Sequence, residues 1–190
     1  MAEKEDHVYI NQVLDGDMSA FAWLVDKHKQ NAYTLALKIV KNEYDAEEVS
    51  QDAFLKAFKA LSKFKQESSF STWLYRIVYN TALSKIKKKQ LDTTPIEDGH
   101  HNITMGKLTE SMTGLIAEDR KKYLKLAINK LGDEEAVLVN LYYTAEKDMT
   151  EIAQVMDMSH VNVRVKLSRV RKKLYTILEQ LLKGEIRNIV

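Results

Sequence analysis

The sequence of 190 residues is 45% hydrophobic, and its 29 Lys and Arg residues against 27 Asp and Glu residues leave a formal net charge of only +2. Any attraction to nucleic acid must therefore come from how the charges are distributed along the chain. The sequence has no Cys, which excludes a disulfide framework, a thiolate zinc site and a cysteine nucleophile. With no recognisable signal peptide and no apolar stretch near the ~20 residues that span a bilayer, we expect a soluble, cytoplasmic protein with no segment inserted in a membrane.

Helical periodicity dominates the first half of the chain, and no segment alternates with period two over the length of a strand. The expected fold class is therefore all-α. Helices are expected over residues 8–14, 19–41, 45–61 and 71–89. Asp45 is predicted to cap the third of these helices, with Glu48 as its capping-box partner, and Phe58 is predicted to lie in its buried stripe.

The periodicity stops between residues 91 and 114, where the sequence has its only Pro and three of its six Gly residues. This composition predicts a flexible linker between an N-terminal domain, residues 1–90, and a C-terminal domain, residues 115–190. His100 and His101 lie in this stretch without carboxylates at ligand spacing, so we interpret them as linker residues and not as a metal site.

Helical patterns resume over residues 117–131, 133–143 and 149–183, and the last of these ranges has the form of a helix-turn-helix. Thr150 is expected to cap the first helix of this motif, and Asp157 falls in the turn where a positive φ is usual. Val161 is assigned to the buried side of the second helix.

The exposed side of that second helix is rich in basic, amide and hydroxyl groups. This composition suits base reading and phosphate binding in a major groove. The alternative is a solvated basic helix that covers a small bundle. The candidate DNA contacts are His160, Asn162, Arg164, Lys166, Ser168, Arg169 and Arg171.

The helix expected over residues 71–89 carries a mixed polar and aromatic side that a purely buried helix does not need. Trp73, Arg76, Asn80 and Lys87 fall on this side, a composition that tracks a phosphate backbone while stacking exposed bases. The preceding loop, 63–70, is expected to form a polar-edged pocket for a base turned out of the stack. Taken alone, Trp73 fits a half-buried core residue better than a residue that contacts a base.

Two stretches carry a resemblance to a known family. The segment "NEYDAEEVSQDAFLKAFKALSKFKQESSFSTWLYRIVYNTALSKIKKK" resembles the second region of bacterial RNA polymerase sigma factors of the extracytoplasmic-function (ECF) subfamily, within the sigma-70 family. The segment "MTEIAQVMDMSHVNVRVKLSRVRKKL" resembles the fourth region of the same family. The run "SSFSTWLYRI" is the most specific part of this likeness. Asp157 and Val165 depart from the residues usual at those positions.

The resemblance implies three partners: RNA polymerase core, promoter DNA as duplex and as non-template single strand, and an anti-sigma factor. The residues that it implies for core docking are Asp45, Gln51, Asp52 and Leu55. Those implied for opening the start-proximal promoter element are Lys63, Phe64, Ser68, Ser69, Phe70, Trp73, Arg76, Asn80 and Lys87. The helix-turn-helix is implied to read the upstream element as duplex.

Two other classes of protein are alternatives to a sigma factor. The first is a free-standing helix-turn-helix regulator, which would bind duplex DNA without polymerase. The second is an enzyme, and it has little support because the sequence lacks a Gly-rich phosphate loop with Lys and a His-Glu-x-x-His helix. We therefore expect no enzymatic activity, no cofactor and no metal.

Overall fold

The computed structural model describes residues 2–90 and 117–189, with side chains placed for 5–88 and 122–182. Within these ranges the backbone forms helices and turns and no strand, which confirms the all-α prediction. The predicted linker lies outside the described residues. No helix in the described ranges is both long and apolar enough to cross a membrane.

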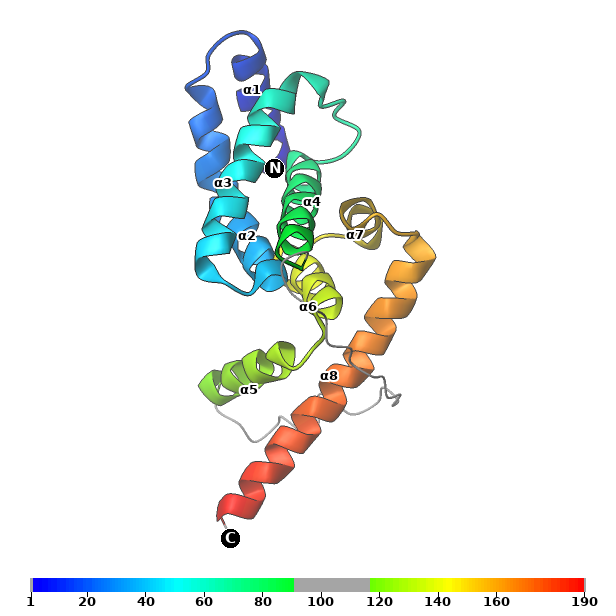
Figure 1. Cartoon of the computed structure of the whole chain (residues 1–190). Helices are drawn as coiled ribbons and strands as arrows, with labels where there is room; N and C mark the ends of the chain where they lie inside the picture. The colour runs from blue at the N-terminus through cyan, green and yellow to red at the C-terminus, as the bar shows by residue number, and fades with distance from the viewer. Residues whose placement is uncertain (1, 91–116, 190) are drawn as a thin grey trace.

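Four α-helices make the N-terminal bundle (Figure 1). They are α1 (Ala2–Leu14), α2 (Ala20–Val40), α3 (Glu43–Ala60) and α4 (Phe70–Gln90), with a short 3₁₀ turn η1 (Leu61–Lys63) after α3. Helices α2, α3 and α4 pack against one another, and α1 packs on α2. Leu24, Val49 and Leu74 lie at the centre of this bundle and are at most 1% exposed. The break between the first two helices falls at Gly16, whose φ of +107° favours glycine.

The start of α3 differs from the prediction. Asn42 is the N-cap, and its side-chain oxygen accepts a hydrogen bond from the backbone N–H of Asp45 at 3.0 Å. Asp45 therefore lies inside the first helical turn, where it is 5% exposed and pairs with Lys85 of α4 at 3.7 Å. Phe58 is 36% exposed, so it lies at the edge of the core, where its ring packs edge-on to Phe21 at a centroid distance of 5.0 Å.

The C-terminal bundle contains α5 (Ala117–Asn129), α6 (Asp133–Val139), a π-helical turn η3 (Asn140–Thr144), α7 (Met149–Met156) and α8 (His160–Ile189). Helices α7 and α8 form the predicted helix-turn-helix, and α5 and α6 pack against α8. Asp157 ends α7 with a φ of 53°, as predicted. Ile152, Val163 and Leu167 bury the inner side of the motif.

Two details of the helix-turn-helix prediction are wrong. The cap of α7 is Asp148, whose carboxylate accepts hydrogen bonds from the backbone N–H groups of Thr150 at 2.7 Å and Glu151 at 2.8 Å. Glu151 completes a capping box by accepting from the N–H of Asp148 at 3.1 Å. Val161 is 66% exposed, because it lies in the first turn of α8 on the same side as Arg164 and not on the side that faces α7.

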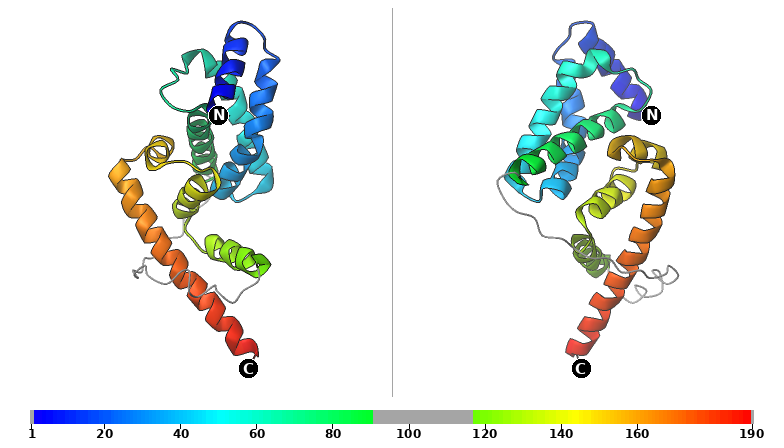
Figure 2. Two further views of the ribbon diagram at one scale, coloured as in Figure 1. Left: turned by 180° about the vertical axis from the view of Figure 1, so that it is seen from behind. Right: turned by 45° about the vertical axis from the view of Figure 1, so that its right-hand side comes forward.

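The two bundles touch. Helix α7 packs against α4, and α6 packs against α2 (Figure 2). Lys41, at the end of α2, forms an ion pair with Asp133 at the start of α6. The hydroxyls of Ser69 and Thr72 at the start of α4 donate to Glu151 at the start of α7, so the first turns of these two helices lie side by side.

Candidate nucleic-acid interface

An aromatic cluster supports the start of α4. The ring of Trp73 lies 4.9 Å from that of Phe64 and 5.8 Å from that of Phe70, measured between centroids. The two Phe residues are 9% and 3% exposed, whereas Trp73 is half-buried. Phe64 and Phe70 thus act as packing residues that hold the loop, and Trp73 is the aromatic side chain of the three that keeps a partly open surface.

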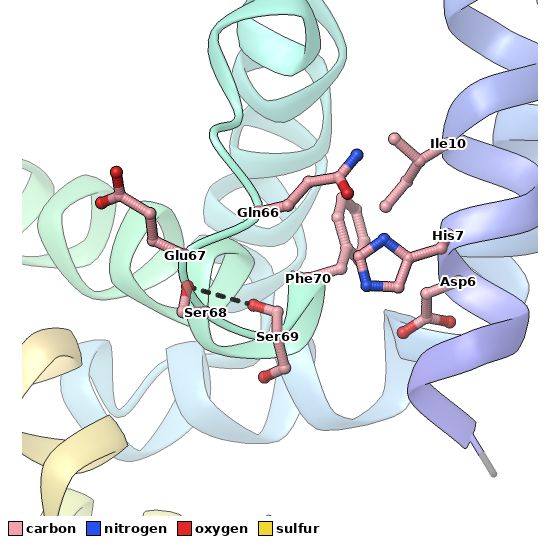
Figure 3. A pocket seen from close by; sticks show the side chains of 8 residues that line it. All are labelled: Asp6, His7, Ile10, Gln66, Glu67, Ser68, Ser69 and Phe70. Atoms are coloured by element: carbon pink, nitrogen blue, oxygen red, sulfur yellow. Dashed lines mark hydrogen bonds between the residues drawn. The ribbon is translucent and has the colours of Figure 1, made fainter.

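A polar cavity of about 280 Å³ lies beside this cluster. It is lined by Asp6, His7, Ile10, Gln66, Glu67, Ser68, Ser69 and Phe70 (Figure 3). The loop side of the cavity agrees with the predicted position of a pocket, but the opposite wall comes from α1. Sequence reasoning missed that wall because nothing in the local pattern of α1 indicates which loop it packs beside.

Asp6 gives the α1 wall its charge. Asp6 is 4% exposed, and its carboxylate accepts a hydrogen bond from Lys27 Nζ at 2.7 Å and lies 3.2 Å from His28 Nε2. Burial raises the pKa of Asp6, but the hydrogen bonds and charges of His28 and Lys27 outweigh burial and hold this pKa below its usual value.

The predicted mixed side of α4 is exposed. Arg76, Asn80 and Lys87 lie on the surface, and Leu74 and Val78 are fully buried on the opposite side. Arg76 is also within 3.5 Å of Asp157, in the turn of the helix-turn-helix. The α4 surface therefore combines two cations, an amide and a half-open indole.

The exposed side of α8 carries five of the seven predicted DNA contacts. These are His160, Asn162, Arg164, Ser168 and Arg169, all exposed. The other two have partners within the bundle. Lys166 pairs with Glu134 of α6 at 2.5 Å. Arg171 stacks on Tyr142 and Tyr143, and its Nε donates to the Tyr143 hydroxyl at 2.8 Å.

The predicted docking residues of α3 separate into two groups. Gln51, Asp52 and Leu55 are exposed, and Leu55 keeps 58% of its surface open although it is apolar. Asp45 is buried against α4, so it stabilises the bundle and offers no open carboxylate beside the other three.

Hydroxyl groups at the start of α4 make the polar contact with α7. Ser69 caps α4 by accepting from the backbone N–H of Thr72 at 3.2 Å. The hydroxyls of Ser69 and Thr72 also donate to Glu151, and Lys147 donates to Ser69. Sequence reasoning did not single out Lys147 or Glu151, although the pattern of Asp148 followed by Glu151 is that of a capping box.

Family models match both bundles. The model of sigma-70 region 2 matches residues 24–91, and that of sigma-70 region 4 matches residues 121–174. The ECF RNA polymerase sigma factor SigW of Bacillus subtilis is 32% identical over 173 residues, which cover 87% of this chain and 92% of that protein. This chain belongs to the ECF sigma factors. The ECF sigma-E factor of Escherichia coli is 27% identical, over 89% of this chain and 92% of that protein.

Solved structures support the fold of this ECF sigma factor. The structure of CnrH in complex with the cytosolic domain of CnrY has a TM-score of 0.65 at 22% identity, over 92% of this chain and 97% of that one. The sigma factor RpoE in complex with the anti-sigma factor NepR from Bartonella quintana has a TM-score of 0.62 at 20% identity, over 84% of this chain and 96% of that one. Among the described residues, no group of His, Asp and Glu side chains has the arrangement of a metal site.

Proposed function

We propose that this sigma factor binds RNA polymerase core through α3 and carries the promoter contacts on α4, the preceding loop and α8. It acts in the cytoplasm and lends promoter specificity to polymerase without catalysing a reaction itself. The proposed domains are 1–90 for core docking and promoter opening and 115–190 for duplex recognition, joined by residues 91–114.

The observation that carries the proposal is the arrangement at the start of α4. The half-open indole of Trp73, the exposed Arg76 and the polar cavity beside Phe70 lie near the start of α4, and the exposed Lys87 lies toward its other end. A duplex-binding helix needs neither a stacking surface nor a cavity for a base, whereas melted DNA needs both. The combination therefore supports contact with the non-template strand near the start site.

The α3 surface supports core docking. Leu55 is an exposed apolar side chain beside the polar Gln51 and Asp52. An apolar side chain with polar neighbours is typical of a surface that binds another protein. Asp45 contributes to this surface only indirectly, by joining α3 to α4 through Lys85.

The exposed side of α8 supports duplex recognition. His160, Asn162 and Arg164 lie near its N-terminus, the part of a recognition helix that contacts base edges. Arg169, further along, suits a phosphate. Lys166 and Arg171 already have partners inside the bundle, so their contribution to DNA binding is smaller or requires a change of partner.

We also propose an anti-sigma factor as a partner, since CnrH and the Bartonella RpoE were each solved with such a protein or a cytosolic domain bound. A free-standing regulator is the second candidate. It is favoured only by the helix-turn-helix, and it leaves the α4 surface and the cavity without a role.

Transcription with purified core polymerase tests the proposal. Promoter fragments from the source genome are transcribed with and without the protein, and open complexes are mapped with permanganate. We expect new, selective transcripts and melted thymines only when core and protein are both present. Duplex binding by the protein alone, with no core binding and no transcript, would instead establish the regulator.

A further inference from the structure

Two exposed valines lie on the proposed recognition side of α8. Val161 keeps 66% of its surface open, and Val165 keeps 42%. The two residues are four positions apart, so they lie on the same side of the helix, about 6 Å apart along its axis. Among the described side chains of α8, only these two are both apolar and exposed.

The valines point away from the core of their bundle. Val163, Leu167 and Val170 form the buried side of α8. At the helical period of 3.6 residues per turn, the side that carries Val161 and Val165 is opposite to this buried side. A recognition helix lies in the major groove, and the side opposite to its own core then faces the bases. The two valines are therefore placed at the centre of the recognition side.

Exposed polar and basic groups flank the valines. Arg164 lies on one side of the pair, and Asn162 and Arg169 lie on the other. In a major groove the base edges lie between two phosphate strands, so an apolar centre with a cation on each flank matches the groove. A protein partner would also cover exposed valines, but the basic flanks favour DNA.

Valine is not the residue that a solvated helix favours. A β-branched side chain loses χ1 freedom in a helix, and its helix propensity is lower than that of Lys, Arg or Ala. A single exposed apolar side chain needs no explanation. Two valines one turn apart, both on the side that faces the groove, form an apolar contact surface in the region where base edges are read.

We propose that Val161 and Val165 select the upstream promoter element by packing against thymine methyl groups in the major groove. Thymine is the base that presents an apolar group there, its C5-methyl. Because base pairs rise roughly 3.4 Å, residues about 6 Å apart reach pairs about two steps apart. The element therefore contains two A·T pairs at this spacing. The proposal rests on the proposed function, because it requires that α8 enters the major groove.

A selection experiment identifies the element. Random DNA duplexes are selected for binding to the full chain, once with polymerase core and once without it, and the enriched duplexes are sequenced. We expect an upstream element with two A·T pairs about two steps apart. An enriched element without A·T pairs at this spacing would overturn the proposal. Failure to enrich any element under either condition would refute duplex recognition, and the proposal with it.

Uracil substitution then tests the methyl contacts. Each thymine of the enriched element is replaced in turn by uracil, which removes the 5-methyl group and leaves the base pair and its hydrogen-bonding groups in place. Loss of one buried methyl group should weaken binding about fourfold, measured by fluorescence anisotropy. Uracil at thymines outside the element should leave the affinity unchanged.

Two variants connect the methyl groups to the valines. Val161→Ala and Val165→Ala should each lower the affinity for the thymine duplex and remove the uracil effect at one position. Neither variant changes a charge, so the slope of log K against log salt concentration should stay at its wild-type value. Alanine has the higher helix propensity, so both variants should keep the wild-type circular dichroism. Val8→Ala, the same change at a 53% exposed position of α1, should keep the affinity and the uracil effect.

Distinct outcomes separate the valine contacts from the function on which they rest. An equal uracil effect in the wild type and in both α8 variants would show that another residue contacts the methyl groups, which would overturn the proposal. No uracil effect at any position would also overturn it and would leave the valines as a surface for a protein partner. Enrichment without core, with no core-dependent transcript, would refute the sigma function, while uracil substitution in that element would still decide the role of the valines.

Discussion

The hydroxyl of Ser69 donates a hydrogen bond to the carboxylate of Glu151 at 3.0 Å, although 82 positions separate the two residues. Ser69 caps α4 and lines the polar cavity, and Glu151 belongs to the capping box of α7. This bond, together with those from Thr72 to Glu151 and from Lys147 to Ser69, connects the first turns of two helices with separate proposed roles in promoter recognition. Changes at either helix start are expected to affect the other bundle.

Capping of α7 is the first test. Asp148→Ala removes the acceptor of two backbone N–H groups and should lower the free energy of unfolding by about 1 kcal/mol. Thr150→Ala is the matched control, because the Thr150 side chain is exposed and does not cap the helix. Urea denaturation followed by circular dichroism measures both. A larger loss of unfolding free energy for Thr150→Ala than for Asp148→Ala would indicate that Thr150 is the cap, as expected from the sequence.

Trp73 should matter for promoter opening more than for core binding. Trp73→Ala removes the half-open ring that packs on Phe64 and Phe70, and it should cost about 2 kcal/mol of stability because the site is only half-buried. Permanganate footprinting should show fewer melted thymines at unchanged affinity for core. Trp73→Phe keeps an aromatic surface and should retain most of the opening. Equal losses of core affinity and of opening would mean that Trp73 is a packing residue only.

Substitutions of the basic side chains of α8 should change DNA binding to different extents, depending on whether the side chain already has a partner within the bundle. Arg164→Ala should lower the slope of log K against log salt concentration by about 0.9, the value for one lost phosphate contact on duplex DNA. Arg171→Ala should change this slope less and reduce stability more, because Arg171 stacks on Tyr142 and Tyr143. Titrations of a promoter duplex at several salt concentrations measure the slopes. An unchanged slope for Arg164→Ala would argue against a phosphate contact.

Core docking should depend on Leu55. Leu55→Ser on the exposed side of α3 should weaken binding to polymerase core roughly tenfold, as for a hot-spot side chain, with little change in stability. Leu126→Ser on α5 is the control, since Leu126 is a comparably exposed leucine at 41% in the other bundle. Surface plasmon resonance with immobilised core compares the two. Equal affinities of Leu55→Ser and Leu126→Ser for core would indicate that the docking surface does not lie on α3.

Asp6 should make stability depend on pH. Asp6→Asn removes a charged acceptor of Lys27 and His28 and should cost about 2 kcal/mol at pH 7. Because the folded pKa of Asp6 lies below its usual value of 3.8, this difference is full above that value and is lost as the pH falls through the folded pKa. Lys27, His28, the nearby Glu5 and Tyr75, whose pKa is raised by burial and partly by the Asp6 charge, are charged or titratable groups around it. Urea unfolding of both proteins from pH 7 downward should therefore give converging curves, and a constant difference would contradict this.

Periodicity and turn chemistry were sufficient to predict the helices, the helix-turn-helix and the exposed side of α4. These are local properties, because hydrophobic spacing determines which side of a helix is buried. Capping was predicted less well. Asn42 and Asp148 lie close in sequence to the residues named as caps, Asp45 and Thr150, and several polar side chains near a helix start can compete for the same N–H groups.

The sequence alone determined the helical architecture, the family and the position of the basic side of α8. Only the tertiary structure decided that α1 supplies a wall of the cavity, that Asp45 is buried, and that Lys147 and Glu151 bind the hydroxyls of α4. Each of these depends on contacts between residues far apart in the chain. Helical spacing orients a side chain about its own axis, but the packing of one helix on another decides which partner it meets.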